Sequence, residues 1–380
     1  MTLRPLTVLP MKRPSSPASV RRRLGLLLGL LAAGALAMAA MPLTAAAHGE
    51  DNDSQFVQTN LVSDVPGWAP IVDPSLVNAW GMSFGPTTPL WVSDNGADVT
   101  TLYNGAAGVN PFAKVPLTVA IPDGAPTGQV FNGGTGFMLA GTPARFIFAS
   151  ENGSIDAWRQ GLTPATDAVN VATTPNAVYK GLAISTGVGG SWLYASNFHD
   201  ARIDVFDGTF AVQSWPGAFM DSHIPAGYAP FNIENLGGKL YVTYAKQDST
   251  KHDDVAGRGH GFVDVYSLTG KLLRRLVRHG QLDSPWGLQI APMGFGPFGG
   301  DLLVGNFGNG RINAYNPRNG EFEGTLRGTN GKPISIDGLW GLQFGNGVAG
   351  TPMTLLFTAG PDGEQHGLLG SLTLAPDTDD

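Results

Sequence analysis

The sequence of 380 residues contains no cysteine and few charged residues. Without cysteine, disulfide-stabilised folds, thiol catalysis, and zinc or iron–sulfur sites held by thiolates are excluded. Charged residues make up only 14% of the chain, whereas glycine occurs 53 times, so the composition favours many tight turns over long surface helices. The sequence also lacks the H-E-x-x-H motif of zinc proteases and the Walker motif of nucleotide-binding loops.

The first 47 residues have the pattern of an export signal. They contain six basic residues and no acidic one, and an apolar run from Leu24 to Ala40 precedes the small residues Ala45-Ala46-Ala47. A basic start, a short apolar run and small residues at a cleavage site predict a secretory signal peptide rather than a retained membrane anchor. We therefore expect an exported protein, periplasmic or extracellular, and leave open whether the Sec or the twin-arginine route is used.

The remainder of the chain is acidic. Without residues 1–47 it contains 17 basic and 30 acidic residues, a net charge of −13. This balance argues against nucleic acid and anionic membranes as partners. No other apolar run is long enough to cross a bilayer, so we expect no membrane span in the mature protein.

A short pattern built on a glycine recurs six times. Its anchor positions are 81, 128, 181, 232, 287 and 341, which lie 47, 53, 51, 55 and 54 residues apart. Trp80-Gly81-Met82, Trp286-Gly287-Leu288 and Trp340-Gly341-Leu342 are the most similar copies, and the copy at Asn232 lacks the glycine. A fixed period of this length is typical of repeat architectures such as propellers.

Each anchor is followed by runs in which apolar and polar residues alternate. Leu90-Trp91-Val92 and Leu302-Leu303-Val304 are examples, and Ile203-Asp204-Val205-Phe206 shows the run that comes next. This alternation predicts strands, and the Gly, Pro, Asn and Asp residues between the runs predict turns. Six units of three or four strands predict an all-β, six-bladed β-propeller with four-stranded antiparallel blades.

The sixth unit ends near Leu374, before a fourth strand is complete. We predict that residues 56–62 supply the missing outer strand and close the ring. The expected organisation is a signal peptide over 1–47, a flexible segment over 48–55, and the propeller over 56–380.

Several segments resemble known propeller repeats. Val304-Gly305-Asn306-Phe307-Gly308-Asn309-Gly310-Arg311-Ile312 is similar to an NHL repeat. Asn78-Ala79-Trp80-Gly81-Met82, Trp91-Val92-Ser93-Asp94-Asn95-Gly96 and the segment from Lys251 to Gly257 resemble an uncharacterised family of exported bacterial NHL-like propellers. The resemblance covers residues 56–374. It implies the fold and export, and it supplies no catalytic residues.

In such blades, the loops between the second and third strands emerge on one side, together with the connections to the next blade. We call this side the loop face. Polar residues expected to contact a ligand there are Asp94, Asn95, Glu151, Asn306, Asp362 and Glu364. The insertion from Lys246 to His260 is about a dozen residues longer than the equivalent loops, and long loops in compact domains are usually functional or disordered.

The loop face also contains residues suited to metal binding and acid–base chemistry. The candidate metal ligands are His199, His252, His260 and His366, and the candidate catalytic residues are Asp200, Asp253 and Asp254. Imidazole and carboxylate groups from several blades would hold Zn²⁺ and leave one position open for water. The alternative is that they are ordinary polar residues of long hydrated loops.

The axial channel is a second candidate metal site. Alternation along the inner strands predicts that Asn232 and Glu234 face the channel with Ser83, Gln289 and Gln343. Oxygen ligands around one carboxylate would suit Ca²⁺, and the alternative is a water-filled channel.

Two functions of different classes remain open. The first is a binding module whose loop face engages a protein, a peptide or a carbohydrate. The second is a metal-dependent hydrolase or lyase, lactonase-like or amidating-lyase-like, with Zn²⁺ or Ca²⁺ as cofactor. Convergence of three candidate side chains would favour the enzyme, and a scattered arrangement would favour binding.

Overall fold

A computed structural model describes residues 55–106, 110–187 and 189–376. The expected signal peptide and the segment 48–54 lie outside these residues. In the described residues, regular structure consists of strands and two short 3-10 helices, η1 (Asn95–Ala97) and η2 (Gly296–Phe298). No helix in this part of the chain has the length and apolar character needed to cross a membrane. The all-β prediction is confirmed.

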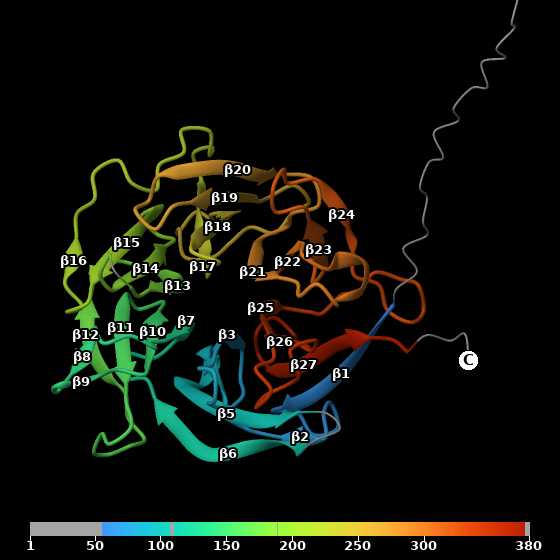
Figure 1. The fold of residues 1–380 in the computed structure, drawn as a ribbon, viewed down its shortest axis with the longest axis horizontal. Helices are drawn as coiled ribbons and strands as arrows, with labels where there is room; N and C mark the ends of the chain where they lie inside the picture. The colour runs from blue at the N-terminus through green and yellow to red at the C-terminus, as the bar shows by residue number, and fades with distance from the viewer. Residues whose placement is uncertain (1–54, 107–109, 188, 377–380) are drawn as a thin grey trace, which may run out of the picture. The chain divides into compact units, whose positions relative to one another are not determined.

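Six sheets surround a central axis and form the six blades of the propeller (Figure 1). The first blade consists of β3 (Ala79–Ser83), β4 (Leu90–Asp94), β5 (Val99–Ala106) and β6 (Asn110–Ala120). The second blade consists of β7 (Pro126–Phe131), β10 (Phe146–Ser150), β11 (Ser154–Trp158) and β12 (Val169–Thr173). The third blade consists of β13 (Tyr179–Ser185), β14 (Trp192–Asn197), β15 (Arg202–Asp207) and β16 (Val212–Gln213). Between β7 and β10, a small hairpin is formed by β8 (Met138–Leu139) and β9 (Thr142–Pro143).

The remaining blades follow the same order. The fourth blade consists of β17 (Tyr228–Leu236), β18 (Lys239–Lys246), β19 (Phe262–Tyr266) and β20 (Leu272–Arg278). The fifth blade consists of β21 (Pro285–Ile290), β22 (Leu302–Asn306), β23 (Ile312–Tyr315) and β24 (Phe322–Thr325). The sixth blade contains β25 (Leu339–Phe344), β26 (Leu355–Ala359) and β27 (Leu368–Leu374). Consecutive strands pair antiparallel, so the predicted blade topology is confirmed.

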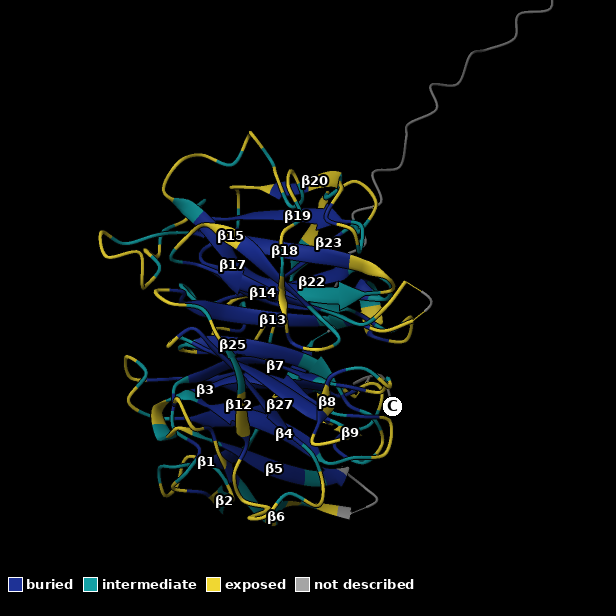
Figure 2. Ribbon diagram, turned by 90° about the vertical axis from the view of Figure 1, so that its left-hand side faces the viewer, coloured by how far each residue is buried: buried dark blue, intermediate teal, exposed yellow. Residues whose placement is uncertain are grey.

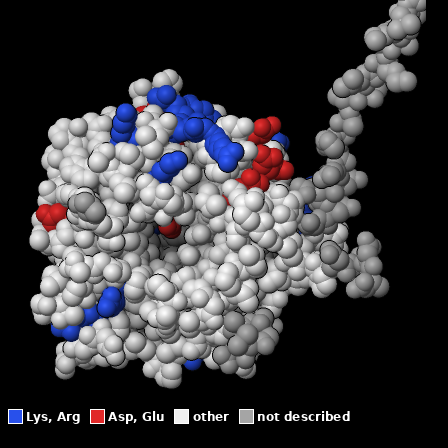
Figure 3. Space-filling model, in the orientation of Figure 1, with Lys and Arg blue, Asp and Glu red and all other residues white. Residues whose placement is uncertain are grey.

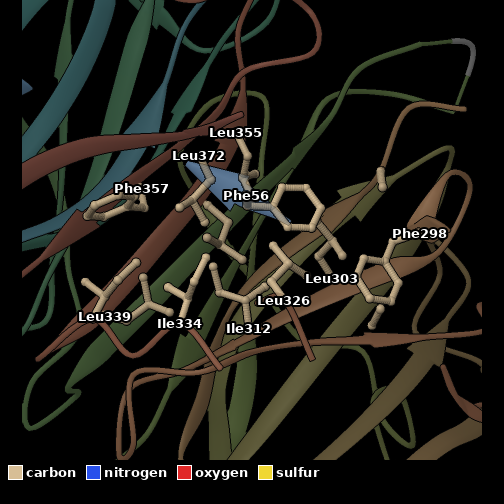
Figure 4. Close-up of a cluster of buried hydrophobic side chains, with 14 of the residues drawn as sticks. Phe56, Phe298, Leu303, Ile312, Leu326, Ile334, Leu339, Leu355, Phe357 and Leu372 are labelled. Carbon is tan, nitrogen blue, oxygen red and sulfur yellow. The ribbon is translucent and has the colours of Figure 1, made fainter. Parts of the chain in front are cut away.

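The two ends of the described chain meet in the sixth blade. Strand β1 (Phe56–Ser63) pairs antiparallel with β27, with Phe56 opposite Leu374. A short strand β2 (Ile71–Val72) adds to the other side of β1 in parallel. Figure 4 shows Phe56 among buried side chains of the sixth and fifth blades, including Leu372 and Phe298. The predicted ring closure is confirmed, and each of these apolar side chains contributes about 1.5–3 kcal/mol when it is fully buried.

The recurring glycines allow the inner strands to approach one another. A Cβ atom at Gly81 would overlap the backbone of Thr127, and one at Gly128 would overlap the backbone of Leu182. A Cβ atom at Gly341 would lie 2.8 Å from the carbonyl oxygen of Trp80, which returns the ring to the first blade. The period of the sequence therefore reflects close backbone contact around the axis. Figure 2 shows the buried strands of the blades, with the exposed residues concentrated in the loops.

Candidate functional site

The residue before each anchor position is buried near the axis at the loop-face end of the inner strands. These six residues are Trp80, Thr127, Lys180, Phe231, Trp286 and Trp340. The rings of Trp80 and Trp340 stack with their centroids 3.6 Å apart, and Trp286 lies edge-on to both. Phe307 stacks on the other face of this group, 4.0 Å from Trp340. The end of the channel below the loop face is therefore closed by aromatic rings.

Lys180 is the single cation in this ring of six. Its side chain is 2% exposed, and its Nζ forms an ion pair with Glu151. The Asp253 carboxylate lies 3.5 Å from the same nitrogen, and the Trp80 ring centroid is 5.1 Å away. A buried ammonium group is tolerated only where charges and hydrogen bonds replace water. Glu151 and Asp253 supply these charges from the second and fourth blades.

Amide side chains extend this arrangement to the first and sixth blades. Asn95 donates a hydrogen bond of 3.0 Å to Glu151 Oε2. Asn78 donates to Asn95 Oδ1 at 3.1 Å and to Glu364 Oε2 at 2.7 Å. The Asn78 backbone has a φ of 47°, a left-handed conformation that asparagine tolerates better than most residues. We name Asn78, Asn95, Glu151, Lys180, Asp253 and Glu364 the axial polar cluster.

Carboxyl groups outnumber cations at this end of the axis. Burial raises the pKa of Glu364, and it also raises the pKa of the neighbouring Asp254. The Asp254 Oδ2 atom and the Trp80 Nε1 atom are buried, and neither has a hydrogen-bond partner among the described residues. Unpaired buried polar atoms are costly, so these two atoms add to the polar character of this end of the axis.

One group of side chains has the geometry of a metal site. The ligand atoms of Glu151, His252 and Asp253 all lie within 4.8 Å of one another. His252 and Asp253 belong to the insertion between β18 and β19 and are exposed, whereas Glu151 is partly buried. One imidazole and two carboxylates are the ligand types of a zinc site with three protein ligands and an open position, and both carboxylates here also pair with Lys180. No other group of three such residues occurs in the part of the chain that the structure describes.

The other predicted histidine ligands lie in separate places. His199 pairs with Asp200 at 2.9 Å, and His366 Nδ1 lies 2.8 Å from the Asp64 carboxylate. The imidazole of His260 contacts the Val255 carbonyl oxygen at 2.8 Å. The four predicted histidines therefore do not share one site. The partners of Asp200 include Arg202 and Asn197, and these neighbours together with His199 lower its pKa.

The remaining predicted loop-face residues divide into two groups. Asn95, Glu151 and Glu364 join the axial polar cluster. Asp94 is fully buried inside the first blade, where burial raises its pKa well above the ordinary value. Asn306 is also buried and donates to the Gln281 carbonyl oxygen at 2.8 Å. Asp362 is exposed, and its backbone nitrogen donates to Asp337.

Glu234 lies in the axial channel, beneath the aromatic rings. It lines a cavity of about 10 Å³ together with Trp286, and a wider one of about 210 Å³ with Ser83 and Gln343. Burial raises the pKa of Glu234 to about 8. Figure 3 shows acidic atoms in the hollow at the centre of the face that it draws. The Asn232 side chain does not face this cavity, contrary to the prediction. It is 1% exposed and donates a hydrogen bond of 2.8 Å to the Trp286 carbonyl oxygen.

Two short stretches match catalytic motifs by spacing alone. The segment Gly81-Met82-Ser83-Phe84-Gly85 has the G-x-S-x-G spacing of serine hydrolases, but Ser83 is in an inner strand and donates to Gln129 at 3.2 Å. Gly294 to Gly299 has the G-x-G-x-x-G spacing and leads to another strand rather than to a long helix. Neither segment has the structural context that its motif requires.

Sequence reasoning did not single out Lys180 or Asn78. A signal was present for Lys180, because it occupies the repeat position that is tryptophan in three other copies. A lysine where the equivalent residues are aromatic indicates that its charge has a partner nearby. No comparable signal marks Asn78, whose role depends on the conformation of its loop.

Comparison with known proteins places the chain among its relatives. No family model matches it. It is 32% identical over 332 residues to the uncharacterised protein R648 of Acanthamoeba polyphaga mimivirus, covering 82% of this chain and 78% of the viral protein. It is 33% identical to the uncharacterised protein L690 of the same virus, covering 82% of this chain and 84% of that protein. The chain belongs to the same family as these viral proteins. They give no support to the expected bacterial origin.

The fold is shared with more distant proteins. The GH93 α-L-arabinofuranosidase of Fusarium graminearum superposes with a TM-score of 0.51 at 10% identity, over 84% of this chain and 98% of that enzyme. At this identity the likeness shows the propeller fold alone.

Proposed function

We propose that this protein is an exported binding module that recognises a positively charged group of a protein or peptide at the axial polar cluster. The observation that carries the proposal is the convergence of carboxyl groups from the second, fourth and sixth blades around the axis. Glu151, Asp253, Asp254 and Glu364 face one buried lysine, so the site favours added positive charge. The pattern of residues 1–47 supports the part of the proposal that concerns export.

The position of the site supports this function. Asp253 is 69% exposed, so its carboxylate is available to a partner that approaches the loop face. The aromatic rings beneath the cluster close the channel, so a ligand would rest on a rigid floor. Rigid placement of polar groups reduces the conformational entropy that binding costs.

The test compares a labelled pentalysine peptide with a labelled pentaglutamate peptide by fluorescence anisotropy at low salt. We expect pentalysine to bind and pentaglutamate not to bind. Asp253→Asn should weaken pentalysine binding by about fivefold, because one exposed charge pair contributes up to about 1 kcal/mol. Glu321→Gln makes the same charge change in the turn between β23 and β24 of the fifth blade, at the end of the blade opposite the loop face, and should have no effect. Equal binding of both peptides would disprove the proposal.

A second candidate function rests on the group formed by Glu151, His252 and Asp253. We propose a metal-dependent hydrolase or lyase in which these three side chains hold Zn²⁺ and Asp254 acts as general base. Zinc would lower the pKa of a bound water and supply the nucleophile. Burial raises the pKa of Asp254, which is the direction of shift that strengthens a carboxylate as a base.

The metal site is tested with two matched histidine variants and isothermal titration with Zn²⁺. His252 and His199 each pair with the aspartate that follows, at 2.8 and 2.9 Å, but only His252 has a third ligand beside it. We expect His252→Ala to abolish stoichiometric binding and His199→Ala to leave it unchanged. Zinc binding without any hydrolysis of lactone or ester substrates would contradict the hydrolase activity.

A further inference from the structure

A cavity between the first and second blades has the size of a ligand site. Its volume is about 590 Å³, within the range of about 300–1,000 Å³ that is usual for small-molecule pockets. Its lining contains aromatic side chains from both blades. Trp91 and Phe146 are each 2% exposed and Trp158 is 8% exposed, whereas Leu117 and Phe131 are half-buried. The rings of Trp91 and Phe146 stack with their centroids 4.1 Å apart and form a rigid backing, and Leu117 and Phe131 supply the accessible apolar surface.

At three other blade interfaces, a phenylalanine from a connecting loop packs on an aromatic residue of the neighbouring blade. Phe137 packs on Phe210 between the second and third blades, with ring centroids 5.1 Å apart. Phe219 packs on Tyr266 at 5.4 Å between the third and fourth blades. Phe295 packs on Phe344 at 4.9 Å between the fifth and sixth blades.

The first blade lacks such a residue. Its connection from β3 to β4 is the short segment Gly85-Pro86-Thr87-Thr88-Pro89, which contains no aromatic side chain. Thr87, Thr88 and Pro89 line the mouth of the cavity instead of filling it. No aromatic side chain of this connection packs into the cavity, and we call the cavity the slot.

One charged side chain lines the slot. Arg145 is exposed, and no acidic residue lies within ion-pair distance of its guanidinium in the described residues. Its backbone is fixed by a hydrogen bond of 2.7 Å to the Trp158 carbonyl oxygen. A guanidinium group beside an aromatic wall suits a ligand that combines an anionic group with an apolar body.

We propose that the slot between the first and second blades binds an amphipathic organic anion. Its apolar rings or branches contact Leu117, Phe131 and the exposed edge of Trp158, and its anionic oxygens accept hydrogen bonds from Arg145. This site differs from the axial polar cluster in residues and in the sign of charge that it attracts.

The experiment uses two probes of nearly equal shape. 1-Anilinonaphthalene-8-sulfonate carries an anionic sulfonate, and N-phenyl-1-naphthylamine has the same rings without it. Fluorescence titration of the folded protein should show one saturable site for the sulfonate and weaker binding of the neutral compound. Arg145→Gln should weaken sulfonate binding about tenfold, which corresponds to about 1.4 kcal/mol, and leave the neutral compound within twofold.

Two further variants make the test decisive. Ala165 is exposed at the edge of the slot, so Ala165→Trp should occupy the space and abolish binding of both probes without unfolding the protein. Arg318→Gln removes the same charge from an exposed turn of the fifth blade and should change neither affinity. Near-UV circular dichroism checks that each variant is folded. Binding that is not saturable, or sulfonate binding that is unaffected by Arg145→Gln or by Ala165→Trp, would overturn the proposal.

Discussion

Lys180 and Glu234 are both ionisable residues near the axis, but their surroundings differ. Lys180, at the loop-face end, has Glu151 and Asp253 as partners and lies beside the Trp80 ring. Glu234, further along the inner strands, has no ion-pair or hydrogen-bond partner among the described residues, and burial raises its pKa to about 8. The charge of Lys180 is balanced by neighbouring carboxylates, whereas Glu234 keeps its proton and is neutral at neutral pH.

These surroundings indicate where the fold brings polar residues together in a site. A buried ion pair with aligned amides requires several blades to supply residues at matching heights, and this occurs at the loop face. A lone acid in a narrow channel requires no such coordination. The axial polar cluster is therefore the stronger candidate for a binding site. Glu234 is expected to make the stability of the fold depend on pH.

The largest effect is expected when the matched charge is removed. Lys180→Met leaves the Glu151 carboxylate partly buried without its cation, and breaking a buried pair in this way costs about 3–5 kcal/mol. Urea denaturation followed by tryptophan fluorescence measures the loss in the free energy of unfolding.

A double variant distinguishes loss of charge pairing from loss of packing. In Lys180→Met with Glu151→Gln, no unpaired charge remains, so the double variant should be more stable than Lys180→Met alone. If the two variants are equally unstable, the contribution of Lys180 comes from packing against Trp80, and the comparison with Glu234 fails.

The sequence predicted the fold because the fold depends on period. Five of the six anchors are glycines at positions where inner strands approach too closely for a Cβ atom, so these glycines recur at the blade spacing. Closure by residues 56–62 followed from counting strands, since the sixth unit lacked one. Both inferences depend on local pattern and number, which a single sequence contains.

The site was predicted less well because loop conformation is not periodic. Asp94 and Asn95 are neighbours, but Asp94 ends β4 and is enclosed by the blade, whereas Asn95 reaches Glu151. His252 and His366 both lie in loops between second and third strands, yet they contact Asp253 and Asp64 respectively. The sequence identifies which residues a loop contains, but their convergence depends on backbone angles within it.

A pH-dependent effect of a few kcal/mol, which develops as the pH rises from 4.5 to 8, is expected at Glu234. The ordinary pKa of this group is 4.5 and burial raises it to about 8, so between these pH values the folded state holds a proton that the unfolded state has lost. Stability therefore falls as pH rises from 4.5 to 8, by about 1.4 kcal/mol for each pKa unit of difference. Glu234→Gln cannot ionise and should lose this part of the slope.

The measurement is the difference in unfolding free energy between wild type and Glu234→Gln at pH 5 and pH 9. We expect the variant to gain a few kcal/mol relative to wild type between these two conditions. Asp264, whose pKa burial raises to about 7, contributes a slope of the same sign in both proteins and cancels in the difference. If Glu234→Gln gains no stability relative to wild type at pH 9, a bound cation or another partner already neutralises the Glu234 carboxylate. A chelator would then lower the stability of the wild type only if that partner is a divalent metal.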